Sequence, residues 1–312
     1  MSTVKDLTHA IGQLGTSPGR RPAHQLEALS VSRYTLEHNF RQLETFAADL
    51  EGDARTVRGI ARRSPDTCEF VLGESVRLTH NYVAAAMTLV AHTRNVEREL
   101  FDSVGGLSGC QDRIDRELSS DPLVQFLKRL RVFSLHCRPV TPGVTVKRVI
   151  HGKGPTTYTL SLDAKSLLEW DDWTAPARSY IDSCGAEVPL LETCQRYRDK
   201  VFEFTDWFEG RVSEEFRSEL DDYQTKLRAF HLAEIRDLVA RGDVSSEDSL
   251  DECEDMIFAG VLTTKELSEL AAAGRGSNER LAAALRLLAA HIPVSDGFRR
   301  ELTEWYKRVS GS

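Results

Sequence analysis

Arg131 and His136 lie in the basic stretch that is the best candidate functional site of this sequence, and residues of these two types could act on a phosphate ester. An arginine supplies a permanent cation for a phosphate, and a histidine titrates near neutral pH and can act as a general base. Attack by the neighbouring 2′-hydroxyl of RNA needs these two roles and no metal. At 100° per residue, side chains five positions apart on one helix diverge by about 140°. One helix therefore directs both groups to the same point only if Arg131 reaches around it.

The two residues lie in an interval without acidic side chains. Residues 123–153 hold seven Lys and Arg and no Asp or Glu, in a chain with 48 acidic residues. The basic residues besides Arg131 are Lys128, Arg129, Arg138, Lys147, Arg148 and Lys153. This local charge predicts an anion-binding or RNA-binding site. The alternative is that the basic face pairs with the acidic helices 209–222 or 247–255 of the same chain. The net charge of −8 restricts any RNA contact to this interval.

The sequence gives little indication of other catalytic or metal-binding sites. It has no Walker or H-E-x-x-H pattern, and we expect no metal and no cofactor. The six cysteines lack zinc-binding spacing, so reduced thiols are expected. The acidic residues of 247–255 lack the glycine and alternating ligands of an EF-hand loop. We interpret them as a solvated helix face.

The elements that must position the candidate residues are mainly helices. Apolar residues recur at helical spacing through 26–50 and 70–100, which predicts two long antiparallel helices, the second ended by Gly105-Gly106. A short helix is expected near 112–118. Asp121-Pro122 is typical of a helix start, and the helix that follows runs to His136 before Pro139.

The periodicity changes after this helix. Alternating apolar residues in 144–162 predict a β-hairpin, the only one expected. Helices then resume at 164–170 and 175–183. A long helix follows from 188 to about 241, with a bend near Gly210. Trp170 and Trp173 are expected in the core rather than in a base-stacking platform.

The ends of the chain suggest three segments. Residues 1–24 are rich in Gly, Ser, Pro and Arg and are expected to be flexible, followed by a helical domain over 25–241. Residues 242–312 are expected to form a small C-terminal helical unit that begins with a polar hinge at 242–248. Its helices are expected near 249–259, 264–273, 278–291 and 296–309. Thr263 and Glu266 indicate a capping box. The longest apolar run is too short to cross a bilayer, so we expect a cytoplasmic protein without a membrane partner.

The segment Ser120 to Pro139 resembles one found in helical proteins of the HEPN group. It reads SDPLVQFLKRLRVFSLHCRP, and the family pattern is Asp-x-Pro leading into a helix that ends Leu-Arg-Asn-aromatic-x-x-His, with Pro soon after. The resemblance covers about 25–240. It implies that Arg131 and His136 match the R-x4–6-H motif, which in active members cleaves RNA without a metal, usually in a homodimer. Val132 stands where the motif usually has Asn.

The sequence therefore predicts a mainly α HEPN-like helical bundle with one β-hairpin insertion and a small C-terminal helical unit. The first functional hypothesis is an RNA-binding protein or metal-independent endoribonuclease of the toxin or defence type, acting through Arg131 and His136. The alternative is a catalytically silent module whose basic face binds a protein partner or organises a complex. Val132 favours the second hypothesis, and the acid-free interval fits both.

Overall fold

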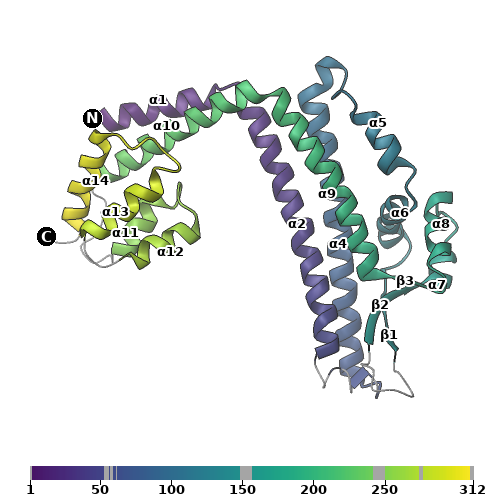
Figure 1. Ribbon diagram of the computed structural model, residues 1–312. Helices are drawn as coiled ribbons and strands as arrows, with labels where there is room; N and C mark the ends of the chain where they lie inside the picture. Colours follow the sequence, from purple (N-terminus) through teal and green to yellow (C-terminus); the bar gives the residue numbers. More distant parts are fainter. Residues whose placement is uncertain are drawn as a thin grey trace. The chain divides into compact units, whose positions relative to one another are not determined.

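Helices dominate the computed structural model, accompanied by a small antiparallel sheet (Figure 1). The structure describes residues 2–52, 56, 59–60, 62–147, 157–241, 250–273 and 277–309. The chain divides into two compact units. Unit 1 contains Met1–Ala23 and Ser213–Ser312, and unit 2 contains His24–Val212. A mainly helical fold is thus confirmed.

Three long helices build most of unit 2: α2 (Arg20–Gly52), α4 (Pro65–Phe101) and α9 (Leu190–Glu215). They run side by side in Figure 1. Phe40, Tyr82 and Tyr197 are almost completely buried between them. The Tyr82 hydroxyl donates to the carbonyl oxygen of Cys194 at 2.6 Å, which ties α4 to α9 inside the core. The two long antiparallel helices expected from the sequence are α2 and α4.

Shorter elements complete unit 2. They are the 3₁₀ turn η1 (Asp102–Val104), α5 (Cys110–Ile114), the π turn η2 (Asp115–Ser119), α6 (Pro122–His136), α7 (Ala164–Leu168) and α8 (Ala175–Ser183). The sheet has the order β1-β2-β3, with β1 (Gly143–Lys147), β2 (Thr157–Asp163) and β3 (Glu187–Pro189). Strands β1 and β2 form the expected hairpin, with Val144 opposite Leu160. Its turn lies outside the described residues.

Strand β3 was not expected. Its three residues pair with the end of β2, where Val188 lies opposite Leu162. Both side chains are buried. A strand this short that ends in Pro189 has too few residues to show an alternating pattern, so only its pairing with β2 reveals it.

Unit 1 packs its helices around an apolar core of its own. Besides α1 (Ser2–Gly15) and α10 (Arg217–Arg241), it contains α11 (Leu250–Phe258), α12 (Thr264–Ala272), α13 (Ser277–Leu288) and α14 (Asp296–Val309). Phe258, Phe298 and Trp305 are almost completely buried in that core. The four C-terminal helices agree with the sequence, and so does the capping box of Thr263 and Glu266. The expected hinge at 242–248 lies outside the described residues.

Three expectations about the ends and the long helix differ from the structure. Residues 2–15, expected to be flexible, form α1, which packs along α10. The long helix breaks at Phe216 and stays helical at Gly210, because a glycine lowers helix propensity without forcing a bend. The compact units divide at 212/213 rather than at 241/242, since α10 packs with α1 and with the C-terminal helices.

Candidate functional site

Helix α6 carries both candidate catalytic residues, and its start is firmly held. The Asp121 carboxylate caps the helix by accepting from the backbone N–H of Val124 at 2.9 Å. Its second oxygen lies 3.0 Å from the Lys200 ammonium of α9. Pro122 occupies the first turn, where no N–H is needed. The sequence predicted this start and the end at His136 correctly.

The inner face of α6 packs on α8 through an aromatic cluster. Phe126 stacks on Trp173 and on Tyr180, with ring centroids 5.6 Å and 5.1 Å apart. Phe133 contacts Trp170 and Trp173. Trp173 is 6% exposed and donates its indole N–H to the Leu167 carbonyl at 2.7 Å. The expectation that Trp173 belongs to the core is confirmed, while Trp170 is half-buried at the edge of the cluster.

Two of the basic residues expected to bind an anion are engaged within unit 2. Arg129 lies over the ring of Trp170, 4.8 Å from its centroid, and donates to the Asp172 carbonyl. Arg138 donates to the carbonyl and the hydroxyl of Ser166 at 2.7 Å and 2.8 Å, and lies 3.2 Å from the Glu169 carboxylate. These contacts hold α7 and the loop after it against α6, so neither guanidinium is available to an external anion without losing them.

Arg131 and His136 are not brought together in the described structure. Arg131 is half-buried on the third turn of α6, and His136 is the exposed last residue of the helix. No hydrogen bond or ion pair of either side chain is found among the described residues. Because helical geometry separates them by about 140°, a single copy does not present them to one phosphate.

Arg131 instead shares the outward face of α6 with other residues. Val124, Lys128, Arg131, Val132 and Leu135 fall within an arc of about 100° on a helix of this pitch. We call these five residues the α6 face. Lys128 is exposed, and Leu135 is 53% exposed. No ion pair of Lys128 or Arg131 occurs within the described part of the chain. Sequence reasoning missed Leu135, although a spacing of seven residues places it on the same side of the helix as Lys128.

The remaining predicted cations are only partly described. Lys147 ends β1 and pairs with Thr157 of β2 through the backbone. Arg148 and Lys153 lie outside the described residues. Of the cations predicted over 128–153, Lys128 and Arg131 are therefore those whose side chains are described and have no ion pair among the described residues.

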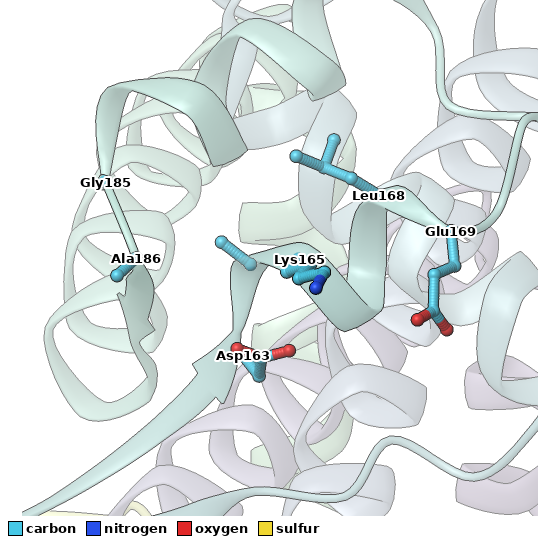
Figure 2. A pocket seen from close by; sticks show the side chains of 7 residues that line it. Asp163, Lys165, Leu168, Glu169, Gly185 and Ala186 are labelled. Carbon is cyan, nitrogen blue, oxygen red and sulfur yellow. The ribbon is translucent and has the colours of Figure 1, made fainter.

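A shallow hollow lies between α7 and the turn that leads into β3 (Figure 2). Its lining consists of Asp163, Ala164, Lys165, Leu168, Glu169, Gly185 and Ala186. Asp163 caps α7 through the Ser166 N–H at 2.7 Å, and Glu169 pairs with Arg138. The side chains of Asp163, Lys165 and Glu169 are exposed. This hollow offers no buried polar group that would hold a small ligand.

The acidic run near the C-terminus is not simply a solvated face. Glu254 is 2% exposed and accepts from Arg280 at 2.6 Å and from the Tyr306 hydroxyl at 2.7 Å. Arg280 also pairs with Asp251 at 2.6 Å. Burial raises the pKa of Glu254. The expectation of a solvated face was thus wrong for Glu254, whose partners lie 26 and 52 residues away in the sequence.

The described residues contain neither a metal-binding cluster nor a membrane-spanning helix. No group of three His, Cys, Asp or Glu side chains placed to bind a metal occurs among the described residues. The six cysteines are free thiols. Within the described parts of the chain, no helix is both long and apolar enough to span a bilayer.

Comparisons with known proteins do not assign the chain to a family. No protein-family model, curated protein or solved structure matches it. The resemblance of residues 120–139 to HEPN proteins therefore stays a prediction from the sequence.

Proposed function

We propose that this chain is a binding module without catalytic activity of its own, and that the α6 face docks a protein partner. The observation that carries the proposal is the division of the basic residues on α6 and just after it. Arg129 and Arg138 contact α7 and the loop after it. Lys128 and Arg131 have no acidic partner within the described residues, and they lie two turns and one turn before the exposed Leu135 on the same side of α6.

The mixed chemistry of the α6 face supports a protein as the partner. Val124, Val132 and Leu135 gain about 25 cal/mol for each Å² of apolar surface that a partner covers, a gain that a phosphate backbone does not supply. Single-stranded RNA is usually held by cations together with aromatic rings on which bases stack. The five residues of the face include no aromatic ring. A partner segment with carboxylates and apolar side chains at helical spacing complements it.

The second candidate is a metal-independent endoribonuclease of the HEPN type. The specific observation in its favour is the exposed His136, whose imidazole has no hydrogen-bond partner among the described residues. Catalysis would require two copies, so that Arg131 of one chain approaches His136 of the other. Val132, in the place of the usual Asn, favours the silent module.

Fluorescence anisotropy with two probes separates the candidates. One probe is an acidic amphipathic peptide with Glu and Leu at i, i+3 and i+4 spacing, compared with its scrambled isomer. The other is a single-stranded RNA, measured in EDTA. We expect the patterned peptide to bind and the Lys128→Glu/Arg131→Glu variant to lose it, while Arg300→Glu, an exposed change in α14, retains it. Tight RNA binding without peptide binding would contradict the proposal.

A further inference from the structure

Helix α2 has an exposed stripe that is independent of the α6 face. Its inner side buries Leu29, Leu36, Phe40 and Leu43 against the rest of unit 2. The opposite side carries Glu27, Val31, Tyr34, His38 and Arg41, which are all exposed and follow one another by three or four positions. We call these five residues the α2 stripe. They share one side of the helix because this spacing matches its 3.6-residue repeat.

The middle of the α2 stripe is apolar and aromatic. Val31 is 59% exposed and Tyr34 is 70% exposed. The rings of Tyr34 and His38 stack with their centroids 5.9 Å apart. Exposure of single apolar residues is ordinary, but here an aliphatic and two ring side chains adjoin on successive turns. Such a surface gains free energy when another surface covers it.

The acidic and basic residues of the α2 stripe, Glu27 and Arg41, lie at its two ends. Arg33 and Glu37, which lie between them in the sequence, are directed toward α9, where Arg33 lies 3.2 Å from Glu209 and Glu37 lies 3.3 Å from Arg198. Glu27 has no ion pair among the described residues. Arg41 uses Nε and Nη1 for Glu37 and Glu44, at 2.7 Å and 2.8 Å, and its Nη2 makes no hydrogen bond within the described chain.

This pattern is complementary to itself in an antiparallel arrangement. Glu27 and Arg41 each lie seven residues from Tyr34, which corresponds to about 10 Å along the helix in opposite directions. In a second copy turned by a two-fold axis through Tyr34, each Glu27 comes level with Arg41 of the other copy. Tyr34 then faces Tyr34 of the second copy, and Val31 of each copy comes close to His38 of the other. A two-fold interface requires this kind of self-complementary patch.

We propose that two copies of the chain associate through the α2 stripe, with α2 of each copy antiparallel to α2 of the other. The charge order along the stripe selects a second copy over an unrelated partner, since one face carries both Glu27 and Arg41 and two copies therefore form the pair twice. A contact between two helices of this length buries a small interface area, so we expect a weak dimer that dissociates on dilution. This proposal does not depend on the α6 face.

Charge exchange measured by sedimentation equilibrium tests the dimer. Glu27→Arg or Arg41→Glu alone places like charges opposite each other twice per dimer, and we expect the dimer to weaken about tenfold or more. The double variant Glu27→Arg/Arg41→Glu restores opposite charges and should restore association. Val104→Glu, a change at a 73% exposed position of η1, should leave it unchanged. Circular dichroism verifies that each variant is folded.

Three outcomes would overturn the proposal: a monomer at all concentrations, a dimer indifferent to both single changes, or a double variant as weak as the single ones. The first would leave the stripe to a different protein. Tyr34→Cys provides a second measurement, because helices packed 8–10 Å apart bring residues near the two-fold axis within disulfide range. Mild oxidation should then give a covalent dimer well above the background of wild type and of Val104→Cys. Absence of that dimer also contradicts the proposal.

Discussion

The guanidinium of Arg129 lies 4.8 Å from the ring centroid of Trp170, so this cation serves the packing of α6 rather than an external anion. Arg131, two residues further on, has no such contact among the described residues. The run of basic residues thus contains cations that are engaged by neighbouring elements and cations without a partner among the described residues. The proposed docking function rests on Lys128 and Arg131, the cations of this run that have no ion pair in the described part of the chain.

Replacement of His136 distinguishes a binding module from a nuclease. We expect purified wild-type protein to leave single-stranded RNA intact in EDTA, and His136→Ala to leave both this result and the fold unchanged. A general base contributes about 10²–10⁴-fold in rate, which is easily detected. Cleavage that leaves a 2′,3′-cyclic phosphate and disappears in both His136→Ala and Arg131→Ala would reverse the choice between the two functions.

Gly19→Ala should destabilise unit 1. A Cβ at this position would lie 1.9 Å from the carbonyl oxygen of Glu219 and 2.9 Å from Cβ of Tyr223, so the start of α10 has to move. Overpacking of this kind costs about 1–3 kcal/mol. The matched control is Gly12→Ala in α1, where nothing lies within 4 Å and a gain of about 0.4–1 kcal/mol is expected. Urea denaturation of both variants checks the prediction, and equal midpoints would contradict it.

Arg280→Met should cost far more stability than the loss of an exposed ion pair. Arg280 and Glu254 are both buried, and removal of the cation leaves a carboxylate without its main partner in the core of unit 1. Such a change typically costs about 3–5 kcal/mol. Arg286→Met, which breaks the exposed pair with Glu269, should cost at most about 1 kcal/mol. Similar losses of unfolding free energy for the two variants would show that the buried pair has no special role.

The capping box of α12 predicts a dependence of stability on acidic pH. Hydrogen bonds from His291, and from the backbone and hydroxyl of Thr263, lower the pKa of Glu266 to about 2. Since the pKa is lower in the folded state, the stabilising contribution is present above the unfolded value near 4.3 and is lost as the pH falls toward 2. Carbon-detected NMR of the Glu266 carboxyl measures this pKa. His291→Gln should raise it, and an unchanged value would contradict the assigned cause.

Local signals in the sequence predicted a large part of the fold. Asp121-Pro122 and Pro139 delimit α6 because capping and proline geometry act over a few residues. The alternation in β1 and β2 likewise predicts the hairpin. Helix α1 was missed because its glycines and the Ser17-Pro18-Gly19 turn suggest irregular structure. Its packing along α10 and the 2.8 Å hydrogen bond from Ser17 to Asp222 join segments far apart in the chain.

The candidate site was less predictable for the same physical reason. The sequence alone does not separate Arg129, Arg131 and Arg138 as candidate anion ligands, because each carries the same charge within the acid-free interval. What separates them is contact with Trp170, Asp172 and Ser166, which lie 28 or more residues away. The exposure of Leu135 depends in the same way on which side of α6 packs against α8. Tertiary contacts therefore decide which of the predicted cations remain available.

Photo-crosslinking from position 135 tests the docking function most directly. A benzoylphenylalanine in place of Leu135 should give, in the source cells, one defined crosslinked species that is sensitive to protease and resistant to ribonuclease. Lys128→Glu/Arg131→Glu should abolish that species, and a crosslinker in place of Val104 should not form it. A ribonuclease-sensitive product, or a protein product indifferent to Lys128 and Arg131, would contradict the proposed role of the α6 face.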